Sequence, residues 1–241
     1  MTFLARKAIK TRKGSRFLVL IMAGLAVAGL SAQTSPASSS LKGMSFNGAT
    51  GLYSIPTGRI GWERTSNLGL DLGYHTVFAH KKAGHIPKVG LSLFKWVELS
   101  GAFDIQPKNV YTYDNGTDFI GGMKVQLPFS KTAVAIGGNI QALNLGKNTA
   151  RYNAGQVYLA ITYAGEFFSM PAETTVVLGK TFIEDRTDSD IDFGMGFDLI
   201  LLPKIFQNYI HWVTDFSNFS YSIEPIGAYS AYRGVLNSGI R

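Results

Sequence analysis

The sequence predicts an all-β protein, and more specifically a closed antiparallel up-and-down transmembrane β-barrel of about ten strands. Three features of the chain predict this fold. Apolar residues alternate with small or polar residues in segment after segment, tight aromatic turns alternate with polar loops, and an export signal precedes the first strand. No segment after residue 40 shows the apolar stripe of an amphipathic helix.

Residues 1–32 have the composition of a secretory signal peptide, in which a basic region precedes a short apolar run. This region holds six Lys and Arg residues and no acid, so its removal lowers the formal net charge from +7 to +1. The charge therefore gives no reason to expect nucleic acid as a partner. The apolar run at 17–32 is shorter than the roughly 20 residues of a membrane-spanning helix. We expect cleavage after Ala32, and an uncleaved N-terminal anchor is the alternative.

The exported part of the chain is predicted to begin with a flexible leader. Residues 33–47 are rich in Ser and Ala at their start, and residues 48–241 are assigned to a single barrel domain. The whole chain contains no cysteine. Its stability must therefore come from backbone pairing and packing, because disulfides cannot contribute.

The predicted strands follow one another along the chain with a period of two. In the first, residues 66–79, the leucines of NLGLDLGYHTVF lie on one side and the glycines on the other. If 51–56 and 219–225 are strands as well, the number rises from about ten to about twelve. The clearest later strands are 88–94, 97–105, 119–127 and 191–201, and less regular candidates are 132–144, 154–164, 174–184, 208–216 and 230–241.

Two kinds of connection alternate between these strands. Short turns face the periplasm in bacterial barrels, and aromatic side chains gather at the two membrane interfaces. We therefore expect the tight connections to form the periplasmic rim and their aromatic residues to form an interfacial girdle. Polar loops are predicted at 80–85, 106–117, 146–153, 184–190 and 217–229, tight connections at 95–96, 128–131, 164–172 and 202–207, and girdle residues at Trp96, Phe129, Phe167, Phe168 and Phe206.

The composition of the two strand faces favours a membrane over water. A soluble antiparallel sheet also alternates, but its polar face meets bulk water and usually carries Lys, Glu and Arg. Here the polar face is mainly Gly, Ser, Thr and Asn with isolated Asp, and the apolar face has almost no charge. Only helices and closed barrels satisfy their backbone groups inside hydrocarbon. The sequence thus favours an outer-membrane barrel, with a soluble periplasmic β-sandwich as the alternative.

The charged residues on the polar side of the strands are the candidate functional residues. They are expected to line the lumen and tune the selectivity of a pore. The alternative is that opposite charges pair across a narrow lumen and fill it, as side chains do in small barrels. The predicted lumen-lining residues are Asp71, His75, Lys88, Glu98, Asp104, Lys124, Asp192, Asp198 and Arg233.

The sequence does not predict an enzyme. His211 and Asp215 share a strand face, but four residues of strand separate them by about 13 Å, which is too far for a hydrogen bond. No serine-nucleophile motif, phosphate-binding loop or zinc-ligand spacing is present. We therefore expect no catalytic residues, no metal site and no cofactor.

Two stretches of the chain are similar to YjbH-like outer-membrane proteins. GATGLYSIPTGRI (48–60) resembles the Gly-Leu-x-x-x-Pro-Thr-Ala-Arg-like segment of that family, and LSLFKWVELSGAFD (91–104) resembles its Leu-Phe-x-Trp hairpin. The likeness extends over about residues 46–165. The resemblance implies an outer-membrane barrel associated with the production or export of exopolysaccharide.

These features lead to one expected function and one alternative. We expect a porin-like barrel in the outer membrane of a diderm bacterium, acting as a passive pore or as an accessory for export of surface polysaccharide or small solutes. The alternative is a non-conducting structural or adhesin-type barrel that acts through its surface loops. In both cases the expected partners are outer-membrane lipid and the barrel-assembly machinery, with small solutes or glycan as candidate ligands.

Overall fold

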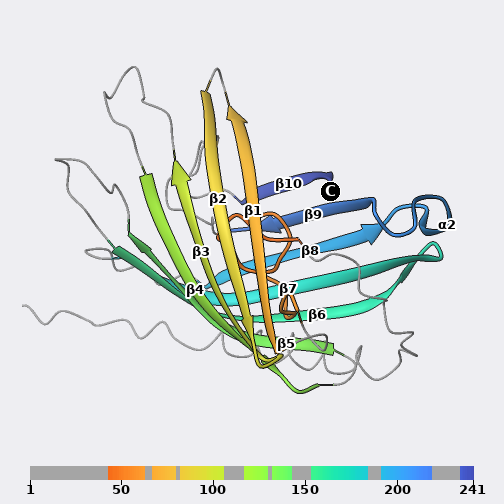
Figure 1. Cartoon of the computed structure of the whole chain (residues 1–241), viewed down its shortest axis with the longest axis horizontal. Helices are drawn as coiled ribbons and strands as arrows, with labels where there is room; N and C mark the ends of the chain where they lie inside the picture. Colours follow the sequence, from red (N-terminus) through yellow and green to blue (C-terminus); the bar gives the residue numbers. More distant parts are fainter. Residues whose placement is uncertain are drawn as a thin grey trace, which may run out of the picture. The chain divides into compact units, whose positions relative to one another are not determined.

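The computed structural model describes a single antiparallel sheet and a segment packed on it. It covers residues 43–62, 67–79, 82–105, 117–129, 132–142, 153–183, 191–218 and 234–241. All of these residues belong to one compact unit. Among the described residues, ten strands pair in chain order, each antiparallel to the next (Figure 1).

The strand bounds confirm the predicted all-β, up-and-down organisation with ten strands. Closure of the sheet into a barrel and its insertion into a membrane stay predictions. The strands are β1 (Leu68–Ala79), β2 (Lys82–Leu93), β3 (Val97–Ile105), β4 (Thr117–Leu127), β5 (Thr132–Ala142), β6 (Asn153–Phe167), β7 (Met170–Ile183), β8 (Asp192–Ile200), β9 (His211–Ser217) and β10 (Val235–Ile240).

Three local predictions were wrong. Residues 82–85 belong to strand β2, because the β1–β2 ladder continues to the pair Ala79↔Lys82, so the predicted loop 80–85 is shorter than expected. The predicted tight connection at 164–172 is shorter than expected, because β6 extends to Phe167 and β7 begins at Met170. The connection at 202–207 does lie between two strands, and it contains one helical turn, α2 (Pro203–Phe206). Residues 51–56 form no strand of the sheet and take part only in an isolated bridge, Gly51↔Pro56. Residues 219–225, the other optional strand, lie outside the described residues.

The tight connections are strained in a consistent way. All the described non-glycine residues with positive φ lie in three of the connections that follow even-numbered strands. The backbone of a bulky side chain rarely adopts this conformation, yet Phe94 and Phe168 have φ values of 54° and 49°. These hairpin turns hold exposed aromatic rings at their tips. The predicted girdle residues Trp96, Phe129, Phe167, Phe168 and Phe206 are all exposed.

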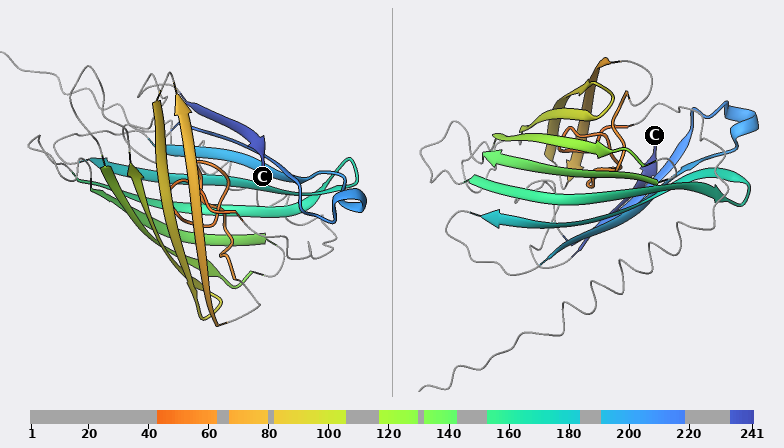
Figure 2. Two further views of the ribbon diagram at one scale, coloured as in Figure 1. Left: turned by 45° about the horizontal axis from the view of Figure 1, so that its top comes forward. Right: turned by 90° about the horizontal axis from the view of Figure 1, so that it is seen from below.

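The two faces of the curved sheet differ sharply in what covers them. Leu68, Leu70 and Leu72 of β1 are 58–77% exposed on the convex face. On the described strands, alternation places a single charged side chain on that face, Lys180. The concave face is largely buried, and the segment 43–62 packs against it (Figures 1 and 2). No helix among the described residues has the length and hydropathy to cross a membrane.

Candidate functional site: the inner segment and the residues that hold it

Residues 43–62, called here the inner segment, form the candidate functional site together with the concave face of the sheet. The segment contains no regular secondary structure beyond two isolated bridges, Met44↔Thr50 and Gly51↔Pro56. Most of its side chains are nevertheless buried or half-buried, and those of Ile55 and Ile60 are fully inaccessible. Residues 43–47, which the sequence assigns to a flexible leader, are part of this packed segment, and the remainder of the leader lies outside the described residues.

The segment is folded on itself by short-range hydrogen bonds. The amide of Phe46 donates to the carbonyl of Tyr53 at 2.8 Å, and the amide of Gly51 donates to the carbonyl of Gly43 at 2.9 Å. The Ser45 hydroxyl donates to the side chain of Asn47 and to the carbonyl of Ala49, at 2.5 and 2.9 Å. These bonds make a compact coil from residues that carry no helical or strand periodicity.

A buried irregular segment needs partners for its remaining backbone groups, since an unpaired buried N–H or C=O costs about as much as a lost hydrogen bond. Inner-face side chains of the sheet supply these partners. The amides that donate to them are those of Thr50 and Gly61 (to Glu98), Tyr53 and Ser54 (to Asp215), Gly58 (to Thr162), Ile60 (to Gln126) and Trp62 (to Ser92).

Glu98 and Lys124 form the central ion pair of the site. Their charged groups are 3.2 Å apart, and both side chains are almost fully buried. Glu98 also accepts a hydrogen bond from the Thr50 hydroxyl at 2.5 Å, and Lys124 donates to the carbonyl of Thr50 at 2.9 Å. Two buried charges are tolerated only when they are paired and fully hydrogen-bonded. Here the backbone of the inner segment completes that bonding.

Asp215 plays a similar part on strand β9. One of its carboxylate oxygens accepts from the amides of both Tyr53 and Ser54 at 2.7 Å. The other oxygen accepts from the Ser54 hydroxyl at 3.0 Å and from the Asn237 side chain at 2.8 Å. Burial raises the pKa of the neighbouring Tyr53 phenol above its usual value, against the opposing effect of Arg241. The phenol is therefore neutral near pH 7.

Arg241 and Lys88 hold the carbonyl groups of the inner segment. Arg241 donates to the carbonyl of Gly51 at 3.2 Å and pairs with Asp198 of β8 at 2.5 Å. Asp198 also pairs with His211 of β9 at 2.6 Å. Lys88 of β2 donates to the carbonyls of Met44 and Ser45, at 2.8 and 2.9 Å. The positively charged side chains of the site thus bind backbone carbonyls of the inner segment, and its carboxylates bind backbone amides.

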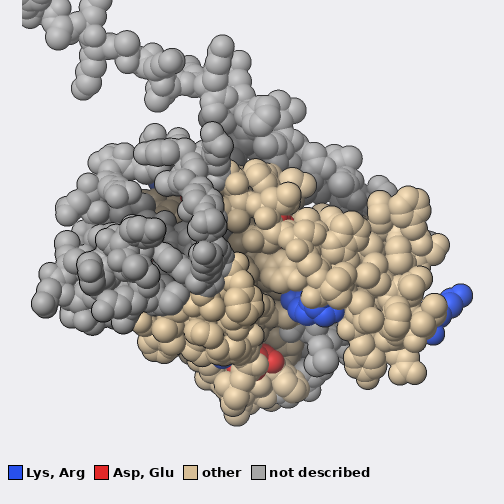
Figure 3. Space-filling view, turned by 90° about the horizontal axis from the view of Figure 1, so that it is seen from above, with Lys and Arg blue, Asp and Glu red and all other residues tan. Residues whose placement is uncertain are grey.

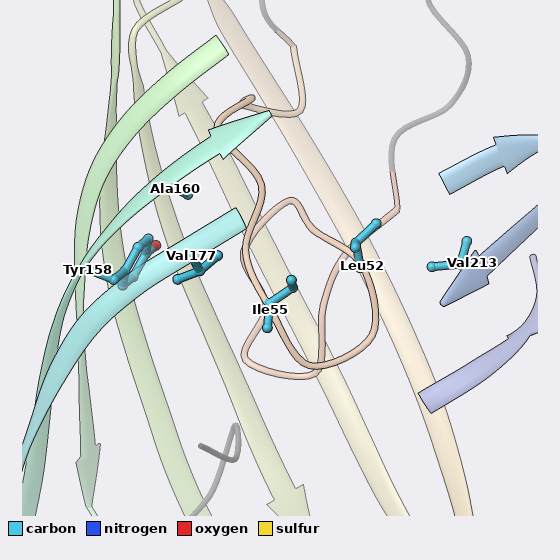
Figure 4. Close-up of a cluster of buried hydrophobic side chains, with 6 residues drawn as sticks. All are labelled: Leu52, Ile55, Tyr158, Ala160, Val177 and Val213. Carbon is cyan, nitrogen blue, oxygen red and sulfur yellow. The ribbon is translucent and has the colours of Figure 1, made fainter. Parts of the chain in front are cut away.

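Apolar packing completes the contact. Leu52 and Ile55 of the inner segment form a buried cluster with Tyr158, Val177 and Val213 on three strands (Figure 4). A second cluster is formed by Ile86, Ala102 and Ile120, against which Phe46 and Val77 pack.

The inner segment packs so closely on the concave face that several positions there have room only for glycine. A Cβ atom at Gly69 would lie 2.0 Å from Cγ of Trp62, and one at Gly196 would lie 2.6 Å from Cδ1 of Leu52. In the inner segment, Gly48 has a φ of +88°, and a Cβ there would lie 2.6 Å from the carbonyl oxygen of Gly101. A side chain at these positions would push the segment off the sheet.

The predicted lumen residues separate into two groups. Those around the inner segment are Asp71, His75, Lys88, Glu98, Lys124 and Asp198. They are buried or partly buried, and the Phe46 ring packs edge-on against His75 at 5.2 Å. The second group lies against other residues of the sheet: Asp192 accepts from Thr181 and Gln156, and Asp104 lies opposite Asp118 in the β3–β4 register. Arg233 lies outside the described residues.

Several residues of the site have no place in the sequence prediction. The sequence prediction names Asp215 only as a strand neighbour of His211, and its lumen residues do not include Gln126, Thr162 or Arg241. It also divides the inner segment between a leader and the start of the barrel. One sequence signal could have indicated it: the glycine and proline content of GATGLYSIPTGRI is unsuited to a membrane strand.

No protein-family model, curated protein or solved structure matches this chain. The likeness of 48–60 to YjbH-like proteins therefore stays a prediction.

Proposed function

We propose that the protein is an outer-membrane β-barrel whose interior is sealed by its own inner segment, and that it acts as a non-conducting structural barrel. The observation that carries this proposal is the occupied concave face. Hydrogen bonds, ion pairs or van der Waals contacts join the inner segment to each of the ten strands; examples are Trp62 to β1 and Gly58 to β5. A barrel closed around this segment has a protein core in place of a water-filled channel.

The convex face supports the membrane part of the proposal. Hydrocarbon disfavours charge, and the described strands carry large apolar side chains there with one lysine among them. The surface in view in Figure 3 likewise shows few charged side chains among its described residues. Exposed apolar patches of this extent are rare on soluble monomers. An exported chain with such a surface fits the outer membrane, and a salt extract without detergent that contained the protein would contradict this location.

Ion conductance through a planar bilayer tests the sealed interior. The hydroxyl oxygens of Ser54 and Ser217 are 3.4 Å apart, so the double variant Ser54→Cys/Ser217→Cys can fix the inner segment to β9 through a disulfide. The chain has no native cysteine to interfere. We expect no ion steps from the wild-type protein, and none from the variant either oxidised or reduced.

A matched control links two strands without the inner segment. The hydroxyls of Thr214 and Ser238, on β9 and β10, are 2.8 Å apart on the outward side. Thr214→Cys/Ser238→Cys should behave like the wild type in both redox states. Stable ion steps from the wild type that persist in oxidised Ser54→Cys/Ser217→Cys would overturn the sealed interior. Steps that oxidation abolishes in this variant and not in the control would favour the passive pore or export accessory, with the inner segment as its gate.

A further inference from the structure

The first and last strands of the sheet have different surroundings from the others. β1 pairs with β2, and β10 pairs with β9, but no hydrogen-bonded ladder joins β1 to β10 among the described residues. The line between them, called here the seam, is where the proposed barrel has to close. An edge strand presents unpaired N–H and C=O groups, which is unfavourable in hydrocarbon.

The inner segment contacts both sides of this seam. On the β1–β2 side, Phe46 packs against His75 and the ammonium group of Lys88 holds the carbonyls of Met44 and Ser45. On the β9–β10 side, Asp215 holds the amides of Tyr53 and Ser54. A Cβ at Gly239 of β10 would lie 2.6 Å from the Tyr53 hydroxyl, so Tyr53 also packs directly on the last strand.

The part of the segment that joins these two sides is tied internally. The hydrogen bond from the Phe46 amide to the Tyr53 carbonyl links the residue packed on β1 to the residue packed on β10. The bond between Gly51 and Gly43 runs beside it. Arg241 follows β10 and reaches the same place, where its guanidinium contacts Gly43 and donates to the carbonyl of Gly51.

We propose that residues 43–54 act as a clamp that holds β1–β2 and β9–β10 at a fixed separation, so that the inner segment sets the geometry of the seam. The clamp is short, internally bonded and attached at each end by a charged side chain. Loss of either attachment should let the two edges of the sheet move apart. The other strands have direct ladders to both neighbours and should be unaffected.

The distance across the seam can be measured with spin labels. Leu70 on β1 and Leu236 on β10 are exposed by 58% and 69% on the outward face, so Leu70→Cys/Leu236→Cys adds two labels without touching the clamp. Double electron–electron resonance in lipid should give one narrow distance distribution. Lys88→Met and Asp215→Ala, placed on opposite sides of the seam, should each broaden this distribution and shift it to longer distances.

Combining the two changes should broaden the distribution at least as much as either change alone, because the contacts of Arg241 with Gly43 and Gly51 remain in each single variant. Thr162→Ala is the matched control, since Thr162 holds the amide of Gly58, outside the clamp, from strand β6. It should leave the distribution unchanged. Where Asp215→Ala does not yield a heat-modifiable folded band, Arg241→Gln replaces it in the same measurement.

Three outcomes would overturn the clamp: a wild-type distribution in the folded end variants, an effect from only one side of the seam, or an equal effect from Thr162→Ala. The inference rests on the proposed barrel, but the two fail separately. If the wild-type protein conducts ions but Lys88→Met and Asp215→Ala still broaden the distance distribution, only the sealed interior is rejected. An unresponsive seam in a non-conducting barrel would reject the clamp alone.

Discussion

The two faces of the same strands are built by different rules. On the outward face of β1, Leu68, Leu70 and Leu72 carry the same apolar side chain and are largely exposed, which suits the fluid hydrocarbon environment that we propose. On the inward face, Gly69 leaves room for Trp62, and on β2 the ammonium of Lys88 meets two particular carbonyl groups. Composition is enough to specify the first face. The second is specified position by position, because it has to match one folded segment.

The largest loss of unfolding free energy is expected on the inward face, at the ion pair of Glu98 and Lys124. Lys124→Met leaves Glu98 as an uncompensated buried charge, which typically costs about 3–5 kcal/mol of unfolding free energy. Urea titration in detergent measures this loss. The double variant Lys124→Met/Glu98→Gln should recover part of it, because no unpaired charge then remains. A double variant less stable than Lys124→Met would show that the pair is not the cause.

A charge on the outward face should be costly for a different reason. Leu72 lies in the middle of β1 and is 77% exposed, so Leu72→Lys places an ammonium where we expect hydrocarbon. A mid-bilayer lysine costs about 2–4 kcal/mol, against about 0.5 kcal/mol for an ordinary water-exposed substitution. Phe168→Lys at a turn is the matched control and should cost about 1 kcal/mol or less, as expected at an interface. Equal small losses in liposomes would indicate water on both surfaces.

The substitution of glycine by alanine should also have different effects on the two faces. A Cβ at Gly58 of the inner segment would lie 2.2 Å from the carbonyl oxygen of Ala133, and this backbone atom cannot give way easily. Gly58→Ala should therefore lose about 1–3 kcal/mol through overpacking. Gly155 faces outward, and its Cβ would have no neighbour nearer than 3.9 Å. Gly155→Ala should be close to neutral in the same titration, and a loss as large as that of Gly58→Ala would contradict the packing account.

The smallest effect is expected at the partly exposed ion pair of Arg59 and Glu173. Their charged groups are 2.8 Å apart, and their side chains, at 12% and 25% exposed, are less buried than those of Glu98 and Lys124. Solvent screens such pairs, which contribute about 0.2–1 kcal/mol. Arg59→Gln should lower the unfolding free energy by no more than this amount. A loss comparable to that of Lys124→Met would place the main attachment of the segment at Arg59.

The sequence predicted most of the sheet because strand formation is a local property. Strand β3 has the predicted bounds, 97–105, and β8 differs from its predicted range by one residue at each end. The β1–β2 hairpin was misjudged because the charged and small residues of HKKAGH are typical of loops, whereas pairing with β1 extends the strand. Tertiary pairing overrides such local preferences.

The site was less predictable because its contacts are long-range. Nothing near Tyr53 or Ser54 indicates that Asp215 accepts their amides, across more than half of the chain. The inward placement of Lys88, Glu98 and Lys124 follows from alternation alone. Alternation cannot tell a side chain that lines water from one that holds a peptide carbonyl, so the pore and the filled interior were equally compatible with the sequence.

The central claim is that lipid covers the convex face while the inner segment fills the concave one. Leu72→Cys and Ser54→Cys, labelled separately in intact native membranes, test it most directly. We expect a water-soluble maleimide to modify neither, because lipid excludes the reagent from Leu72→Cys and packing excludes it from Ser54→Cys, and we expect unfolding in urea to make both reactive. Rapid modification of Leu72→Cys by the water-soluble reagent would contradict the lipid-covered face, and modification of Ser54→Cys before unfolding would contradict the filled interior.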